Sequence, residues 1–103
     1  MRVVNMKNEK CDVRCDRGSM LGNKYIIGKD GDREEVIRKY RQWLWVMMNK
    51  NEKILNELKR LVELDKKING KLKLGCWCVP KNCHTFVIIR ACNWLKENGK
   101  EKR

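Results

Sequence analysis

Apolar and polar positions repeat with two different periods along the chain, and each change of period marks an expected element. Residues 2–6, RVVNM, form a short apolar run typical of a buried strand. Residues 11–15, CDVRC, alternate with a period of two, which predicts a second strand. Residues 16–32 contain four glycines and are expected to form a loop, interrupted only by a short apolar run at 25–27.

The period becomes helical after this loop. Asp32 has the chemistry of an N-cap, and Glu35 follows three residues later, as in a capping box. Trp45 lies off the apolar face of this helix and is the aromatic residue that we expect to be exposed. The expected buried stripe consists of Val36, Tyr40, Trp43 and Met47, widened by Ile37, Leu44 and Met48.

A second helix is predicted at 52–68, ended by Asn69-Gly70 as by a C-cap. Its expected buried face consists of Ile54, Leu55, Leu58, Leu61, Val62 and Ile68. Residues 71–78, KLKLGCWC, then alternate as a strand does, and Pro80 ends this strand because proline has no N–H to donate to a sheet. The last helix is predicted within 84–98, with a buried stripe of Val87, Ile88, Ala91, Cys92 and Leu95.

The order β-β-α-α-β-α predicts a small α/β domain in which about three helices cover a short sheet. The 103 residues are enough for a single core, so we expect one domain over 1–103 with a short, flexible, basic tail at about 97–103. No apolar run is long enough to cross a membrane, and the N-terminus lacks the apolar core of a signal peptide. An intracellular, cytoplasmic protein is therefore expected.

The net charge of the chain indicates which kinds of partner to expect. The chain has 25 Lys and Arg residues against 13 Asp and Glu residues, a formal net charge of +12. Such an excess attracts polyanions, so nucleic acid, a nucleotide and an anionic membrane surface are the candidate partners. A lysine-rich protein with no nucleic-acid role is the alternative interpretation. Charge alone gives no specificity, and the lysines are scattered rather than gathered in a stripe. A homodimer formed through an exposed Trp45 or Trp94 is a further interpretation.

The segment GCWCVPKNCH at 75–84 holds three of the six cysteines and the single histidine. It is the main candidate for a functional site in the sequence. Without a secretory signal, metal binding or thiol chemistry is favoured over a disulfide framework. Three thiolates and one imidazole are a common set of zinc ligands, which makes zinc the candidate cofactor. The candidate ligands are Cys76, Cys78, Cys83 and His84, with Cys11 and Cys15 as alternative residues to complete the site.

Two other interpretations of this segment stay open. Cys83 stands at the expected start of the last helix and is the candidate nucleophile, with His84 as its base or orienting group. Alternatively, the cysteines are small apolar core residues, as we expect for Cys92 on the buried stripe of the last helix.

The chain also resembles a known family. The segments VVN, IGKDGDREEVIRKYRQWL and GKLKLGCWCVPKNCH are similar to those of the small proteins grouped as domain of unknown function 4326, found in phages, bacteria and archaeal viruses. The family's Gly-Asn-Pro-Phe motif appears here as Gly22-Asn23-Lys24-Tyr25, and its Cys-His-Gly-Asp motif as Cys83-His84-Thr85-Phe86. The missing acid argues against an enzymatic role, and an origin in a virus-infected host is one implication. The other matching positions are Arg33, Cys76, Trp77 and Cys78.

Ligands of α/β sheets tend to bind beyond the carboxyl ends of the strands, so we expect the Gly-Asn loop and the cysteine–histidine turn to form one site. The leading prediction is a small protein that binds an anionic ligand such as a nucleotide or nucleic acid. The alternative is an enzyme that acts on a nucleoside or nucleotide derivative through Cys83 and His84 or through a bound metal. The candidate ligand-binding residues are Arg17, Gly22, Asn23, Lys24, Arg33 and Trp77.

Overall fold

The computed structural model describes residues 1–16, 19–78, 81 and 83–99. The α/β class and the predicted order of elements are confirmed. Helix α3 extends into the expected tail, and 100–103 lie outside the described residues. The elements are β1 (Arg2–Asn5), β2 (Val13–Arg14), α1 (Arg33–Lys50), α2 (Glu52–Lys67), β3 (Lys73–Cys76) and α3 (Thr85–Gly99).

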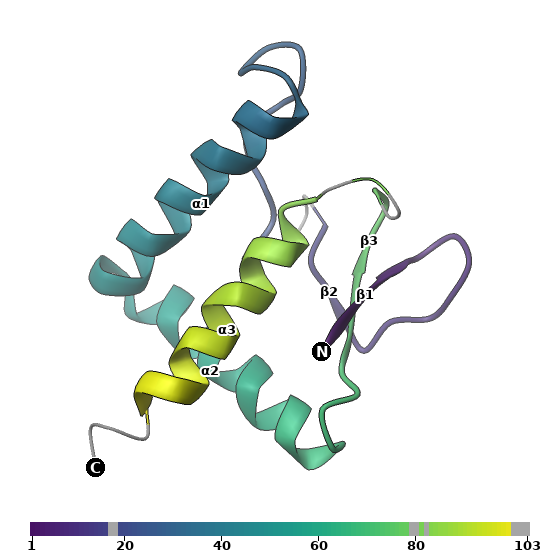
Figure 1. Cartoon of the computed structure of the whole chain (residues 1–103), viewed down its shortest axis with the longest axis vertical. Helices are drawn as coiled ribbons and strands as arrows, with labels where there is room; N and C mark the ends of the chain where they lie inside the picture. The colour runs from purple at the N-terminus through teal and green to yellow at the C-terminus, as the bar shows by residue number, and fades with distance from the viewer. Residues whose placement is uncertain (17–18, 79–80, 82, 100–103) are drawn as a thin grey trace.

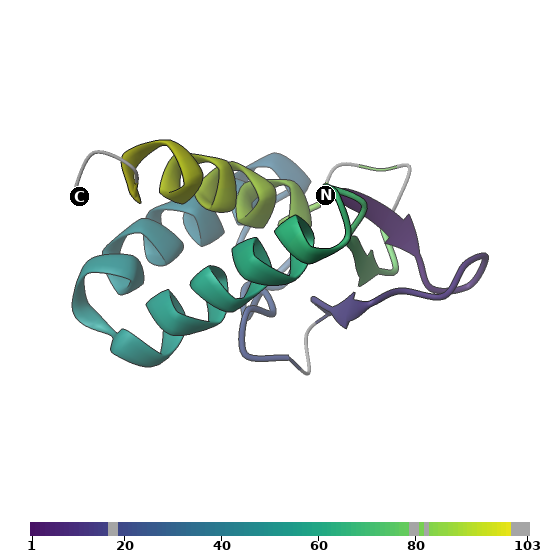
Figure 2. The ribbon, with the colours of Figure 1, turned by 90° about the horizontal axis from the view of Figure 1, so that it is seen from below.

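The sheet has the order β1-β3-β2, and both outer strands run parallel to β3. All strands therefore end at the same edge, and the three helices lie together on one side of the sheet (Figures 1 and 2). Close packing against β3 requires glycine at position 75. A Cβ there would lie 2.5 Å from Cys11 Sγ and 2.8 Å from Met6 Cγ.

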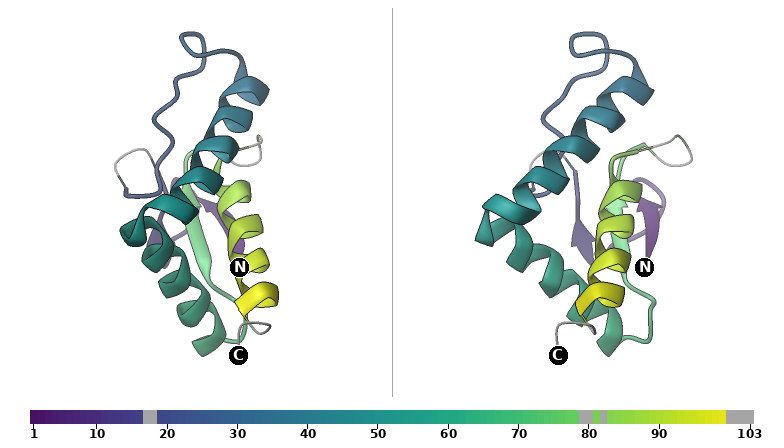
Figure 3. Two further views of the ribbon diagram at one scale, coloured as in Figure 1. Left: turned by 90° about the vertical axis from the view of Figure 1, so that its left-hand side faces the viewer. Right: turned by 60° about the vertical axis from the view of Figure 1, so that its left-hand side comes forward.

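Helices α1 and α2 share one residue at their junction. The Asn51 backbone N–H donates to Met47 and closes α1, while its side-chain oxygen accepts from the N–H groups of Lys53 and Ile54 at the start of α2. The chain therefore turns sharply with no intervening loop (Figure 3). At the other end of α1, Asp32 accepts from the Glu35 N–H at 2.9 Å, which is the predicted N-cap.

The core lies between the helices and the sheet. Two expectations about burial were wrong. Ile68 is 40% exposed, because α2 ends at Lys67 and the next residues, Asn69 and Gly70, have positive φ and redirect the chain toward β3. Trp45 is half-buried, because it meets the Trp94 ring edge-on at a centroid distance of 5.4 Å. The large buried residues include Tyr40, Leu44, Leu58, Leu61, Leu72, Leu74 and Ile88, and Cys92 is buried as expected.

Asp65 is a fully buried carboxylate that joins four segments of the chain. It accepts hydrogen bonds from Lys96 Nζ at 2.7 Å and from the Leu72 N–H at 3.1 Å, and the Met1 amine lies 3.2 Å away. Burial acts to raise the pKa of Asp65, but the donors from Lys96, Leu72 and Met1 outweigh it and lower the pKa. The charged form is therefore favoured in the folded protein.

We expect Asp65→Asn to destabilise the protein by about 2–4 kcal/mol, because it leaves Lys96 without its buried partner. Since folding lowers this pKa, its contribution is fully present above about pH 4 and is lost as the pH falls further. Urea denaturation between pH 3 and 7 should show a smaller acid-dependent loss in the variant than in the parent. Glu63→Gln, at an exposed carboxylate of the same helix, is the control. Equal acid dependence in Asp65→Asn and the parent would contradict this role.

Candidate functional site

A pocket of about 260 Å³ lies where the strands end and two helices begin. Asp16 follows β2, and Cys76 ends β3, with Trp77 and Cys78 directly after it. Arg33 opens α1, and α1 and α3 both begin at this end of the molecule (Figure 1). The sides are mainly apolar or aromatic and include Tyr25, Ile27, Val36, Ile37 and Trp77.

Cys83 and His84 lie side by side at the start of α3. The Cys83 sulfur is 3.5 Å from His84 Nδ1 and 3.3 Å from the Thr85 hydroxyl oxygen. His84 Nε2 contacts the carbonyl oxygen of Cys15, which can only accept, so Nε2 carries the proton. In the neutral ring Nδ1 then carries the lone pair and faces the Cys83 sulfur. A proton can pass directly between these two side chains.

Besides Cys83 and Cys15, Tyr40 also contacts the His84 imidazole. The two rings meet edge-on with centroids 5.0 Å apart, and the Tyr40 hydroxyl donates to the Leu21 carbonyl at 2.6 Å. Burial raises the pKa of Tyr40, so this hydroxyl stays protonated and keeps its hydrogen bond. Tyr40 thus ties the His84 ring to the loop that carries Asn23.

Cys78 and Arg33 also meet at this pocket. Burial raises the pKa of the Cys78 thiol, and the neighbouring Cys83 sulfur acts in the same direction. A hydrogen bond from the Arg33 side chain acts in the opposite direction. The guanidinium group is therefore held beside the sulfur atoms while it lines the pocket.

The loop before α1 contributes a buried amide. Asn23 is 7% exposed, and its side-chain oxygen accepts from the Tyr25 N–H at 2.9 Å in an Asx turn. This turn sets Tyr25 on the pocket wall. At the strand ends, the Trp77 indole N–H donates to Asp16 at 3.4 Å while the Trp77 side chain remains 52% exposed. Asn23, Arg33 and the cysteine–histidine turn thus meet in one place.

Comparison with known proteins identifies the family. The sequence profile of the family described as Domain of unknown function (DUF4326) matches residues 2–94. The chain belongs to this family. A relative from Enterobacteria phage T4, described as an uncharacterized 12.4 kDa protein in the nrdA-td intergenic region, is 33% identical over 95 residues, covering 91% of this chain and 79% of the relative. No solved structure matches the chain.

Most of the positions that carry the resemblance to this family line the pocket. They are Asn23, Arg33, Cys76, Trp77, Cys78, Cys83 and His84. Gly22 lies outside the lining, in a turn where its N–H donates to Ser19 at 3.0 Å. Lys24, a further predicted ligand contact, is not part of the lining, and its Nζ lies 5.7 Å from the Tyr25 ring centroid and 5.4 Å from the Trp43 ring centroid. Arg17 lies outside the described residues.

Three polar or aromatic residues that shape the site were not among the candidate site residues, although Tyr25 and Thr85 stand in the two family motifs. Asp16 follows β2 and could have been found from the rule that sites lie beyond the carboxyl ends of strands. Tyr25 belongs to an apolar run in the sequence, and the Asx turn that sets it on the wall has no clear signal. Thr85 is fully buried beside Cys83, and its role depends on the start of α3.

Within the described part of the chain, no group of three or more His, Cys, Asp or Glu side chains is placed to hold a metal ion. The zinc site expected at the cysteines and His84 stays a prediction that the native mass of the protein would test. Among the described helices, none is both long and apolar enough to cross a membrane.

Two thiols should resist chemical modification in the folded protein. Burial raises the pKa of both Cys15 and Cys92 to about 12, so at pH 8 only about one in ten thousand of either is a thiolate. We expect iodoacetamide to leave both unmodified in the native protein and to modify both in urea, as measured by peptide mass spectrometry. Half-buried Cys11 is the internal reference. Native modification of Cys92 as fast as Cys11 would contradict the assigned core.

Proposed function

We propose that the protein binds a nucleotide in the pocket beyond β2 and β3. The observation that carries this proposal is the meeting of Arg33, buried Asn23 and the exposed Trp77 ring around one hollow of about 260 Å³. A flat, apolar surface suits a stacked base, and a cation beside it suits a phosphate. The combination therefore fits a nucleotide better than it fits a base or a phosphate alone.

Arg33 is the cation of the pocket lining, while the carboxylate of the lining, Asp16, is paired with Arg14 and accepts from the Trp77 indole N–H. Arg33 offers several N–H donors in a planar fork, which matches phosphate geometry. Cys83 and His84 bring the start of α3 to the same hollow, and the first turn of a helix carries the positive end of its dipole. Both features act on a phosphate placed between the two helix starts.

The base would have two kinds of contact. Trp77 provides a ring at the rim for stacking, and Tyr25 provides a second ring on the wall. Asn23 and Asp16 are polar side chains of the same lining, able to distinguish one base edge from another. The net charge of +12 adds a long-range attraction for the phosphate.

The test is calorimetric titration with the common nucleoside 5′-monophosphates and the matching nucleosides. We expect Arg33→Gln to weaken the binding of the monophosphate about tenfold or more, with a much smaller effect on the nucleoside. Trp77→Ala should weaken both by roughly fivefold or more, because both need the stacking surface of the indole ring.

Lys50→Gln is the matched control, since it removes one positive charge from an exposed position of the same helix outside both hollows. Equal losses of affinity in the Arg33 and Lys50 variants would show a general charge effect and contradict the proposed pocket. So would the absence of binding for every monophosphate.

A second candidate is an enzyme that acts on a nucleoside or nucleotide derivative. The contact between Cys83 Sγ and His84 Nδ1 favours it, because sequence neighbours at a helix start often diverge and these do not. In such a reaction the Cys83 sulfur would attack an electrophilic carbon of the ligand, and its proton would pass to His84 Nδ1. The bond to the leaving group breaks, and His84 returns the proton to it, which leaves the carbon bound to the Cys83 sulfur. Water, giving a proton to His84 Nδ1, then attacks this carbon, and the departing Cys83 sulfur takes the proton back.

Incubation with nucleoside derivatives, followed by product analysis, tests this candidate. We expect conversion to be abolished in both Cys83→Ala and His84→Ala and retained in Cys11→Ala, whose thiol lies outside the pocket lining. Intact folding of each variant is checked by circular dichroism. Binding without conversion in the parent would leave the binding function alone.

A further inference from the structure

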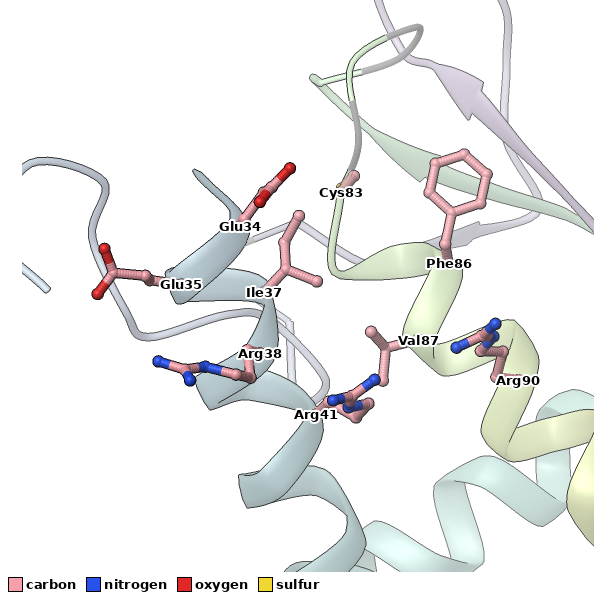
Figure 4. Close-up of a pocket in the computed structure, with 9 residues that line it drawn as sticks. All are labelled: Glu34, Glu35, Ile37, Arg38, Arg41, Cys83, Phe86, Val87 and Arg90. Atoms are coloured by element: carbon pink, nitrogen blue, oxygen red, sulfur yellow. The ribbon is translucent and has the colours of Figure 1, made fainter. Parts of the chain in front are cut away.

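A second, larger hollow lies beside the nucleotide pocket. It is a groove of about 670 Å³ between α1 and α3, which we call the arginine groove. Arg41 of α1 and Arg90 of α3 approach it from opposite sides, and Val87 lies between them (Figure 4). Ile37 adds to the apolar floor, and Phe86 stands at the rim with 41% of its surface exposed.

The arginine groove is positively charged along most of its length. Its two acids, Glu34 and Glu35, belong to the first turn of α1 and lie at one end. Glu35 packs against Gly31, and Figure 4 shows its carboxylate directed away from α3. The carboxylate of Glu34 points toward Cys83 at the start of α3, and Arg38, Arg41 and Arg90 outnumber the two acids in the lining. No hydrogen bond or ion pair with another described residue engages Arg41 or Arg90.

The spacing on α3 places an aromatic ring beside a cation. Phe86 and Arg90 are four residues apart and share one face of the helix. A base stacked on Phe86 would leave its neighbouring phosphate within the range of Arg90, while Arg41 would meet the backbone from the other helix. Alternation of ring and cation along a positive groove is how proteins hold single strands without reading their sequence.

We propose that the arginine groove binds single-stranded nucleic acid, with Arg41 and Arg90 on phosphates and Phe86 stacked on a base. A single strand can enter between the helices and reach Val87 on the floor. A duplex keeps its bases stacked inside, so it offers Phe86 no base to stack on. The proposal does not depend on the nucleotide pocket, because Arg41, Arg90 and Phe86 lie outside that pocket.

The experiment is fluorescence anisotropy of a labelled 12-nucleotide oligodeoxythymidylate at a series of salt concentrations. We expect Arg41→Gln/Arg90→Gln to weaken binding about tenfold or more at low salt. The slope of log affinity against log salt should fall in magnitude by about 1.4, or about 0.7 for each phosphate that no longer meets a guanidinium group. Each single variant should account for about half of that change, which keeps the test valid if the double variant folds poorly.

The matched control is Lys53→Gln/Lys59→Gln, which removes the same charge from exposed positions of α2. Phe86→Leu should weaken binding roughly fivefold or more with no change in the salt slope, because stacking releases no counterions.

Equal losses of affinity in the arginine and lysine variants would overturn the proposal in favour of diffuse charge. Duplex DNA binding as tightly as the single strand would also overturn it, and so would competition by polyglutamate as strong as that by unlabelled oligonucleotide. Monophosphate titration of the arginine variants separates the two sites. If the arginine variants lose oligonucleotide binding and keep monophosphate binding, the oligonucleotide site is the arginine groove. If Arg33→Gln loses monophosphate binding and keeps oligonucleotide binding, the monophosphate site is the pocket.

Discussion

The central position of β3, with a parallel partner on each side, is the constraint on which the rest of the structure depends. Parallel strands cannot be joined by a tight hairpin, so the chain must cross over between β2 and β3, and α1 and α2 form that crossover. All strands then end at one edge, and α3 begins there after β3. Gly75 permits this arrangement because the segment before β2 passes so close that no side chain fits.

The contacts that hold this edge together are the ones that shape the pocket. His84 reaches back to the Cys15 carbonyl at the end of β2, and Tyr40 of α1 packs against the same ring while its hydroxyl holds the loop at Leu21. Each of these is worth only about 1 kcal/mol in stability. Their combined effect is geometric, since they fix the tautomer and orientation of His84 through three separate segments of the chain.

A structural feature could be predicted from the sequence when its cause lies in neighbouring residues. The Asp32 cap, the helical turns and the alternation in β3 depend on neighbouring residues, and their patterns identify them. The exposure of Ile68 depends on one residue at the end of α2, which periodicity does not resolve. The bond from His84 to Cys15 spans 69 positions, and the turn of Lys24 toward Trp43 also depends on a distant part of the chain, so neither leaves a pattern in the sequence.

In the two functions that we propose, the pocket and the arginine groove divide the chemistry of recognition between them. Cys83 and Ile37 line both, so the pocket and the arginine groove adjoin at the start of α3. The overall charge of +12 draws anions to either and selects neither. Selectivity for a ligand must come from the other side chains that line each hollow. In the pocket these are a buried amide and a carboxylate beside aromatic rings, which under our proposal distinguish one base from another. In the arginine groove they are the Phe86 ring and the guanidinium groups of Arg41 and Arg90, which under our proposal meet any base and any phosphate.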